Sequence, residues 1–529
     1  MATFRSLSTL VTFASLATTI LADPSPNAVK VCSILTQQYP EQVGDSGLEL
    51  SNLTIGLDYS AARTGYWSQA NAGVKPACIF FPASTQDVSF AVKTLNNYTD
   101  VPWGVKGGGH NPNVGFSSTQ DGVLLSMEQN WATTRLDEDN LAHIGPGSRW
   151  IDVATALDPY HRAVASGRLG DVGAAGLTLG GGLSFLSTEH GLTADTVHHY
   201  EVVLADGTIT TASKSQNSDL FYALKGGGNQ FAIVTDFVLE TFPIGNVWGG
   251  YKIFAMDRKD AVLRATHNLL SDYYDPKAAV IVTFTTTLHT LVDIFVVFFF
   301  YNDPSGPGEI LSEFNSIPSM LDGTRADRSY KDLLDANSDF SLKGLRYLIR
   351  TGTLPNLPGD AGLDIYNYTL DSWYELAKQY QSQTPLDLLA FSMAFQPVPY
   401  TLANASVHAP HGVNLLGLDP RHGDKLFMEY DVSWLSSATD AAAAAFMTNI
   451  TQPVQDYARR KYATAKPTHY VSGETAVTNF NPLFMNDAMY NQDPVRSYGE
   501  ATYAKLKAIQ EQRDPEGFFS RRAGGFKFT

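Results

Sequence analysis

The chain has 529 residues, more than the roughly 300 that one hydrophobic core usually serves, so we expect two domains. Hydrophobic residues make up 44% and charged residues 17%, which is typical of a globular protein. The formal net charge of -16 excludes the concentrated basic surface that nucleic-acid binding requires.

The first 22 residues have the layout of a secretory signal peptide. Arg5 precedes an apolar, hydroxyl-rich run that stops at Leu21 and Ala22, and this run is too short and too interrupted to span a bilayer. The alternative is a buried N-terminal helix. We expect secretion, or passage through the secretory pathway, with no membrane attachment after cleavage. Five glycosylation sequons agree with this expectation, at Asn52, Asn97, Asn367, Asn404 and Asn449.

The chain has two cysteines, Cys32 and Cys78. In an oxidising compartment such a pair most economically forms one disulfide. Thiol catalysis and a cysteine-ligated metal site are therefore not expected, and the 12 histidines show no HExxH spacing, so no metal is predicted. His198 and His199 are neighbours on a predicted strand, where their side chains should diverge, and we interpret them as structural.

Short strands alternate with helices in the first half. A strand after Pro76 is followed by a Ser/Thr cap and a helix ending near Leu95. Further strands are predicted at 101–105, 122–127, 141–150, 198–213 and 231–245. Asp206 and Gly207 mark a hairpin turn inside 198–213. The pattern indicates an α/β or α+β unit.

After about residue 245, long amphipathic helices alternate with β-rich stretches, which predicts a second domain with an antiparallel sheet and helices on one face. The run 292–301 is short and rich in β-branched and aromatic residues, so we expect a buried strand rather than a membrane span. The run 441–446 is typical of a helix.

Four glycine clusters lie at 106–115, 145–147, 170–182 and 225–235. Glycine lets backbone amides approach a ligand closely, so clusters can cradle an anionic or flat cofactor, whereas any one cluster alone is more simply a tight turn. None reads GxGxxG between a strand and a helix, and GxxxxGK[ST] is absent, which argues against a Rossmann dinucleotide site and a P-loop.

The succession of "PACIFFPASTQDVSFAVK", "KGGGHNPNVGF", "IGPGSRW", "GDVGAAGLTLGGG" and "KGGGNQFAIVT" resembles the vanillyl-alcohol-oxidase-type flavoproteins, in particular their berberine-bridge-enzyme-like branch as found in fungi. The resemblance implies an α+β fold with two domains. An FAD-binding domain of small packed sheets and helices would span 23–245, with its core at about 72–245. A substrate-binding domain, an antiparallel sheet covered by helices, would span 246–480, and 481–529 would return to the FAD domain.

FAD is the cofactor that the resemblance implies. His110 lies where this family links the 8α-methyl group of the flavin covalently to an imidazole. A neutral imidazole is a competent nucleophile for this purpose. The other positions that the resemblance assigns to the cofactor are Lys106, Gly107, Gly108, Gly109, Asn111, Gly115, Gly173, Gly176, Thr178, Gly180, Gly181, Gly182, Gly191, Asp195, Val197 and Asn486.

Departures from the family pattern matter as well. Many relatives have a second covalent link through a cysteine, but Leu169 occupies that position here, so we expect a single tether. Three positions where relatives often place a tyrosine near the flavin are Pro112, Leu183 and Phe484.

Glu429 is the first candidate for a catalytic base. Period-two alternation in 425–434 puts it on the same face as Phe427, and the resemblance points that face at the flavin. A carboxylate in an apolar setting has a raised pKa and can accept a proton. An exposed strand residue is the plain alternative. Tyr400 and Gln396 are further candidates.

Together these features predict a secreted, monomeric FAD-dependent oxidase or dehydrogenase. A small hydrophobic or aromatic metabolite, such as an alcohol, phenol, amine or natural-product intermediate, would transfer a hydride to FAD, and O2 would reoxidise the flavin. The alternatives are a carbohydrate oxidase and a flavin-bound protein that catalyses a non-redox cyclisation.

Overall fold

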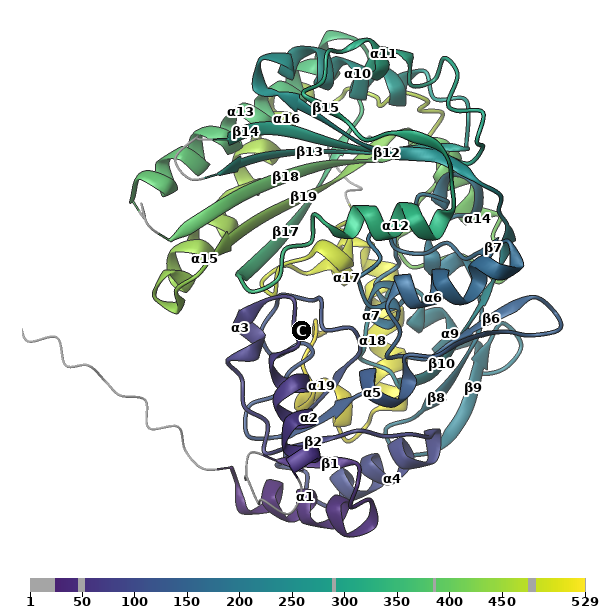
Figure 1. Ribbon diagram of the computed structural model, residues 1–529, viewed down its shortest axis with the longest axis vertical. Coiled ribbons are helices and arrows are strands. Elements are labelled where there is room, and N and C mark those ends of the chain that lie inside the picture. The colour runs from purple at the N-terminus through teal and green to yellow at the C-terminus, as the bar shows by residue number, and fades with distance from the viewer. Residues whose placement is uncertain (1–23, 46–52, 288–291, 384–386, 474–481, 529) are drawn as a thin grey trace, which may run out of the picture.

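The structure is a computed structural model that describes residues 24–45, 53–287, 292–383, 387–473 and 482–528. The predicted signal peptide and Asn52 lie outside the described residues. Figure 1 shows a mixed helix and sheet fold in which a broad sheet, built from the middle of the chain, lies above the N-terminal part.

The first sheet has the strand order β1, β2, β4, β3. Its strands are β1 (Val43–Asp45), β2 (Cys78–Phe80), β3 (Trp103–Lys106) and β4 (Val123–Ser126). The helices of this region are α1 (Pro26–Gln38), α2 (Leu53–Thr64), α3 (Gln69–Ala72) and α4 (Thr85–Asn96). The capped helix is confirmed, because Ser84 accepts a hydrogen bond from the Asp87 amide at 3.2 Å. The disulfide is confirmed as well: Cys32 of α1 is bonded to Cys78 of β2.

The second sheet has the order β5, β6, β10, β8, β9. Its strands are β5 (Thr134–Leu136), β6 (Leu141–Ile144), β8 (Val197–Val203), β9 (Ile209–Ser213) and β10 (Ile233–Glu240). The predicted hairpin between β8 and β9 is confirmed, and Gly207 in its turn has a φ of +81°. The predicted strand at 141–150 is too long, because β6 ends at Ile144 and Trp150 begins α6 (Trp150–Leu157).

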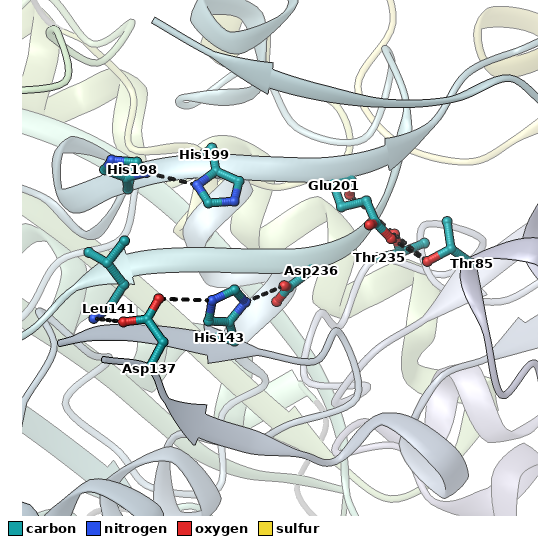
Figure 2. Close-up of polar contacts among 9 residues, drawn as sticks. All are labelled: Thr85, Asp137, Leu141, His143, His198, His199, Glu201, Thr235 and Asp236. Carbon is teal, nitrogen blue, oxygen red and sulfur yellow. Dashed lines mark hydrogen bonds and ion pairs between the residues drawn. The ribbon is translucent and has the colours of Figure 1, made fainter. Parts of the chain in front are cut away.

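The interpretation that His198 and His199 diverge is wrong. Their Nδ1 atoms lie 2.8 Å apart and share a hydrogen bond (Figure 2). In the pairing of β8 with β10, His199 faces Val238 and Val197 faces Leu239, so His198 is the extra residue of a β-bulge. A bulge breaks the strict alternation of side chains along a strand, which brings the two rings together.

Further polar contacts bind α4 and the turn between β5 and β6 to this sheet (Figure 2). His143 of β6 lies between two carboxylates, at 2.6 Å from Asp236 and 3.3 Å from Asp137. Glu201 of β8 accepts hydrogen bonds from Thr235 and from Thr85 at the start of α4. These contacts fix α4 and the turn before β6 against the sheet.

Short helices connect the two sheets to the rest of the chain. They are α5 (Glu128–Trp131), α6, α7 (Ala174–Leu179), α8 (Ser187–His190) and α9 (Ser218–Leu224), and a two-stranded ribbon pairs β7 (Arg162–Ala163) with β11 (Phe242–Pro243). Among the described residues, no helix is long and apolar enough to cross a bilayer.

The third sheet is the large one. Its main path is β15, β12, β14, β13, β18, β19, β17, with β16 beside β12, and every pairing is antiparallel. The strands are β12 (Val247–Ala255), β13 (Ala278–Thr287), β14 (Val292–Tyr301), β15 (Leu321–Asp322), β16 (Arg325–Arg328), β17 (Arg346–Pro355), β18 (Leu388–Val398) and β19 (Lys425–Trp434). The expected strand at 292–301 is thus confirmed.

Helices cover one face of this sheet, as the sequence predicts (Figure 1). They are α10 (Lys259–Ser271), α11 (Ser312–Ser316), α13 (Asp360–Gln383), α15 (Asp440–Asn449) and α16 (Thr451–Tyr462). Phe284, Phe295 and Trp373 lie in the core between helices and sheet. The opposite face looks toward the N-terminal part, with α12 (Tyr330–Ser338) between them.

The C-terminal residues return to the N-terminal part. The helices of this C-terminal segment are α17 (Pro494–Ser497), α18 (Glu500–Arg513) and α19 (Phe518–Arg522). Earlier in the chain, α14 (Tyr400–Val407) follows β18 and lies beside α8. The ring of Phe518 stacks on Trp103 of β3 at 4.5 Å between centroids, and the Trp103 indole donates to the Phe518 carbonyl. The last residues therefore complete the core of the first sheet.

Three described sequon asparagines, Asn97, Asn404 and Asn449, are exposed. Asn367 is half-buried inside α13, where it donates a hydrogen bond to the Leu363 carbonyl. Glycosylation of these residues stays a prediction, and Asn367 is the least accessible of the four.

Removal of the disulfide by Cys32→Ser with Cys78→Ser should lower the free energy of unfolding by about 2–4 kcal/mol, because the bond closes a loop across 46 positions. Thermal melting with and without a reductant measures this. The reductant should lower the melting temperature of the parent and leave the double variant unchanged. Equal melting temperatures for all samples would contradict a stabilising bond.

Candidate active site

The backbones of two glycine clusters touch. A Cβ added to Gly108 would lie 2.5 Å from the Gly173 Cα, and one added to Gly107 would lie 2.8 Å from the Pro146 carbonyl oxygen. No side chain fits at these distances, so the sequence needs glycine here. Three of the four clusters, 106–115, 145–147 and 170–182, therefore meet at one place directly after β3.

The fourth glycine cluster, 225–235, contacts the C-terminal part of the third cluster, 170–182. The Gly228 amide donates to the Leu179 carbonyl at 3.0 Å. Asn486 of the returning C-terminal segment lies on the same loop: its Oδ1 accepts from the Gly182 amide at 3.1 Å, and its Nδ2 donates to the Leu177 carbonyl at 3.1 Å. Gly180 has no room for a side chain, because a Cβ there would lie 2.5 Å from Asn486.

His110 follows the first cluster. Its Nδ1 is buried and makes no hydrogen bond to any described residue, and its ring stacks on Trp67 with 4.4 Å between centroids. Burial lowers the pKa of His110 to about 4, against the opposing charge of Asp171. The imidazole is therefore neutral near pH 7 and keeps a nitrogen available for bonding.

Charged side chains pack against the glycine loop that carries His110. Lys106 is buried, and its ammonium pairs with Glu128 and lies 4.7 Å from the ring centroid of Tyr66. Arg149 binds the same Glu128 at 2.5 Å and donates to the Asp171 carbonyl. The resemblance assigns Lys106 to the cofactor, but its ammonium forms an ion pair with the carboxylate of Glu128.

Other predicted cofactor residues differ in their surroundings. The Asn111 side-chain oxygen accepts from the Asn113 amide at 2.9 Å. Gly115 has a φ of +87°, and a Cβ there would meet nothing within 4 Å. Thr178 is buried in α7, where its hydroxyl donates to the Ala174 carbonyl, and a Cβ at Gly176 would also meet nothing within 4 Å.

Three further residues that the resemblance assigns to the cofactor, Gly191, Asp195 and Val197, lie together around the buried carboxylate of Asp195. Asp195 accepts from the Leu192 amide and from the Asn414 amide, both at 2.9 Å. Gly191 precedes it with a φ of +82°, and Val197 is buried at the start of β8. Asp195 therefore joins the chain near Gly191 to the segment at Asn414.

The inward face of the large sheet has a cluster of acids. Glu429 and Asp431 lie two residues apart on β19, so the predicted common face of Phe427 and Glu429 extends to Asp431. Asp487, one residue after Asn486, accepts a hydrogen bond from Gln396 of β18 at 2.8 Å. Gln396 in turn accepts from Arg168.

Burial and mutual repulsion hold protons on this cluster. Burial raises the pKa of Glu429, and the neighbouring Asp431 raises it further, while Arg168 opposes the effect. The pKa of Asp431 is raised by burial and by Asp487, and the pKa of Asp487 is raised by burial and by Glu429. Three carboxyl groups with one guanidinium thus form a coupled group that can take up or release protons near neutral pH.

The acid cluster and His110 belong to one region. Ile349 and Tyr347 of β17 lie opposite Asp431 and Ser433 of β19, so their side chains point to the same face of the sheet. Tyr347 stacks on Trp67 at 3.8 Å, and Trp67 stacks on His110. Adjacent residues Asn486 and Asp487 provide a second connection, from the loop 176–182 to the acids.

A small cavity opens beside Arg168. Its lining is mostly apolar, from the loop 183–188, from β13 and from the end of β18, and includes Leu183, Phe185 and Tyr273. Phe484 stacks on Phe427 with 5.0 Å between centroids. Leu183 and Phe484, two of the three positions where relatives often have a tyrosine, therefore place apolar side chains near the acid cluster.

Tyr400 lies elsewhere. Its amide donates to Asp424, just before β19, and its ring lies 4.5 Å from that of His469. Glu429 lies five residues after Asp424, and no described contact joins Tyr400 to the acids. Among the described residues, no group of three or more His, Cys, Asp or Glu side chains is arranged to hold a metal ion.

Sequence reasoning missed Arg168, Asp431 and Asp487. The period-two argument that selected Glu429 also applies to Asp431, so that residue could have been found. Asp487 and Arg168 are brought to β19 by segments that are distant in the chain, and no local pattern marks them.

The residues fit the flavin that the resemblance implies. His110 presents a buried nitrogen without a hydrogen-bond partner in the described part of the chain, next to amide-rich glycine loops, which suits attachment of the ring and binding of a diphosphate. A neutral imidazole is chemically suited to act as a nucleophile, and coupled carboxyl groups with raised pKa values are suited to act as a base.

A family model described as "FAD binding domain" matches residues 76–213. An "Uncharacterized FAD-linked oxidoreductase" of Arthroderma benhamiae is 33% identical over 488 residues, covering 91% of this chain and 93% of that protein. The "FAD-dependent monooxygenase drtC" of Aspergillus calidoustus is 30% identical, covering 89% of this chain and 86% of that protein.

Among solved structures, glucooligosaccharide oxidase from Acremonium strictum is similar in fold, with a TM-score of 0.69 and 20% identity. The match covers 93% of this chain and 97% of that protein, whose FAD is described as 6-S-cysteinyl, 8α-N1-histidyl. At this identity the likeness concerns the fold alone.

The buried acids make stability depend on pH. A carboxyl group whose pKa is higher in the folded chain binds its proton more tightly there, so its contribution to stability falls as pH rises from the unfolded toward the folded pKa. Asp431→Asn should therefore raise the free energy of unfolding by about 1–3 kcal/mol at pH 8 and by much less at pH 4.

Chemical denaturation at both pH values measures this difference. The control is Asp139→Asn, which changes an exposed aspartate in the turn between β5 and β6. An equal effect of Asp431→Asn at pH 4 and pH 8 would rule out a raised pKa for this carboxyl group.

Proposed function

The chain belongs to the FAD-linked oxidoreductases, and from this premise we propose that it oxidises a small hydrophobic or aromatic metabolite by hydride transfer to covalently bound FAD. The observation that supports this most is the common location of a neutral His110 and an acid cluster with raised pKa values, joined through Trp67 and Tyr347. FAD, when bound, would supply the hydride acceptor, with O2 as the final oxidant.

His110 is the proposed single tether. Its imidazole nitrogen would hold the flavin through the 8α-methyl carbon, replacing one N–H and one C–H bond by an N–C bond. The two electrons and two protons lost in that attachment would go to O2 as the oxidant, giving hydrogen peroxide. The histidyl link of the glucooligosaccharide oxidase supports this assignment. Both cysteines of this chain are in the disulfide, so neither provides a second link.

The glycine loops are the proposed diphosphate site. The backbones of Gly108 and Gly173 approach closely enough for the loops that carry them to serve one anion together. Arg149 adds a positive charge next to Gly108. Lys106 contributes by anchoring Glu128 rather than by direct contact.

Glu429 is the proposed base. It takes a proton from the substrate hydroxyl or amine while the hydride leaves, and Asp431 and Asp487 share that proton with it. Arg168 offsets the negative charge of the deprotonated base before the transfer, and Gln396 holds Arg168 and Asp487 in place. Leu183, Phe427 and Phe484 exclude water and favour an apolar substrate.

The proposed setting is extracellular. The expected leader at 1–22, the disulfide and the exposed sequons Asn97, Asn404 and Asn449 support secretion. Sizing of secreted protein by light scattering, before and after glycan removal, tests both the location and the proposed monomer.

Carbohydrate oxidation is the second candidate function, because a glucooligosaccharide oxidase has a similar fold. An anaerobic screen for flavin bleaching separates the two. Aromatic alcohols, phenols and amines should bleach the flavin and oligosaccharides should not. Product formation without bleaching would instead favour a non-redox cyclisation, and incorporation of oxygen from O2 into product would favour the monooxygenation named for the Aspergillus relative.

Purified protein should keep its yellow colour in the pellet after acid precipitation, and His110→Ala should release all flavin to the supernatant. The reason is that acid unfolds the chain and frees any flavin without a covalent bond. Absorbance of pellet and supernatant measures the split. Flavin retained in the pellet of His110→Ala would contradict the tether.

Glu429→Gln should lower kcat/KM by about 10²–10⁴-fold, the usual contribution of a general base. A base acts in its deprotonated form, so the pH–rate profile rises as Glu429 loses its proton. Because the pKa of Glu429 is raised above the value of 4.5 for an unperturbed glutamate, this rise should occur at higher pH. The parent rate should therefore rise with pH through neutrality, and the variant should lose this rise.

The matched control is Glu240→Gln, which removes the carboxylate that pairs with His411 at 2.8 Å at the end of β10. It should leave the rise in place. A parent-like pH profile for Glu429→Gln would assign the base to another group.

A further inference from the structure

His110 is the end of a stack of three rings. Trp67 lies between His110, at 4.4 Å and 10° between ring planes, and Tyr347, at 3.8 Å and 14°. The three residues come from three separate segments: the loop after β3, the segment between α2 and α3, and β17. Stacking at these distances and angles restricts rotation of the middle and end rings.

Stacking restrains the imidazole. The Nδ1 of His110 makes no hydrogen bond to a described residue, so this nitrogen stays available for a covalent bond and hydrogen bonding at this atom does not fix the ring plane. The face of Trp67 limits rotation of the ring.

Trp67 itself is held firmly. Its amide donates to the Gly109 carbonyl at 3.0 Å, so it moves with the glycine loop that carries His110. Its neighbour Ser68 accepts from the Tyr347 amide at 3.1 Å, and the Gln69 amide donates to the Leu345 carbonyl at 2.8 Å. The segment 67–69 thus joins the loop to the first residues of β17.

Tyr347 supports the stack from the side of the sheet. Its hydroxyl donates to the Leu342 carbonyl at 2.8 Å, and its side chain shares the inward face of the sheet with Asp431. Trp67 and Tyr347 are 9% and 8% exposed, so water does not separate the rings. The Trp67 Nε1 is buried without a hydrogen bond to a described residue, which shows that polar contact does not explain its position.

We propose that Trp67 is a positioning residue for covalent attachment of the cofactor: backed by Tyr347, it fixes the plane of His110 and keeps the imidazole out of water. This inference rests on the proposed tether at His110 and adds the residues that make the tether efficient. The reacting atoms are those of His110, and Trp67 acts through that ring.

The charges around His110 define what the stack contributes. Asp171 favours the protonated imidazole, and Arg149 and Lys343 oppose it. The dominant influence is burial, which lowers the pKa of His110. Removal of the indole would admit water to one ring face, so the pKa should move back toward the ordinary value of 6.5. A larger fraction of His110 would then be protonated and unable to attack.

The test compares Trp67→Leu and Trp67→Phe with the parent, using the fraction of flavin that stays with the chain in a denaturing gel. Trp67→Leu should lower the rate of covalent attachment by at least about fivefold, the effect of about 1 kcal/mol of lost stacking. Trp67→Phe keeps an aromatic face and should stay within about twofold.

The pH profile of attachment separates positioning from a general loss of structure. In Trp67→Leu the profile should shift to higher pH, whereas a merely destabilised chain, whose acids lower stability as pH rises, would not regain attachment at higher pH. Where Trp67→Leu fails to fold, Tyr347→Leu provides the same test, since it leaves Trp67 and His110 in place and should shift the profile in the same direction by a smaller amount.

Tyr368→Leu is the matched control. Tyr368 stacks on Tyr457 at 3.7 Å and 5°, between α13 and α16 on the other side of the sheet. It should leave attachment unchanged. Parent-like attachment rates and pH profiles in both Trp67→Leu and Tyr347→Leu would overturn the inference, whereas retained covalent flavin in His110→Ala would overturn the tether on which it rests.

Discussion

The candidate site depends on the contact between two glycine backbones, Gly108 and Gly173, which leaves no space for a Cβ on either residue. This contact joins the loop after β3 to the stretch before α7 and brings the amides of both to one place. It also sets where His110 emerges. A side chain at either glycine would separate the loops, and the histidine would no longer face Trp67 and the large sheet.

The second requirement is that acids, half-buried at Glu429 and Asp431 and buried at Asp487, gather on the inward face of the sheet. Glu429 and Asp431 come from one strand, Asp487 from the returning C-terminal segment, and Arg168 from the loop after β7. Three ionised carboxylates gathered in this partly desolvated place would be unfavourable, so protons and one guanidinium remain with them. This coupling suits an FAD-linked oxidoreductase, because a substrate that loses a hydride must also lose a proton.

Local patterns in the sequence predicted much of this. The glycine clusters and the capped helix α4 follow from residue chemistry, and period two placed Phe427 and Glu429 on one face. The bulge at His198 could not be predicted, because it depends on how β8 pairs with β10. The stack of Trp67 on Tyr347 and the meeting of Arg168 with Gln396 join segments more than two hundred residues apart, and no pattern within a segment encodes them.

The central claim is that His110 alone attaches the flavin. The most direct measurement is peptide mapping by mass spectrometry of the protein as isolated. The peptide that contains residues 106–115 should carry the mass of FAD, or of its flavin fragment, with fragmentation placing it on His110. An unmodified peptide at this position, or flavin mass on a peptide elsewhere in the chain, would contradict the account.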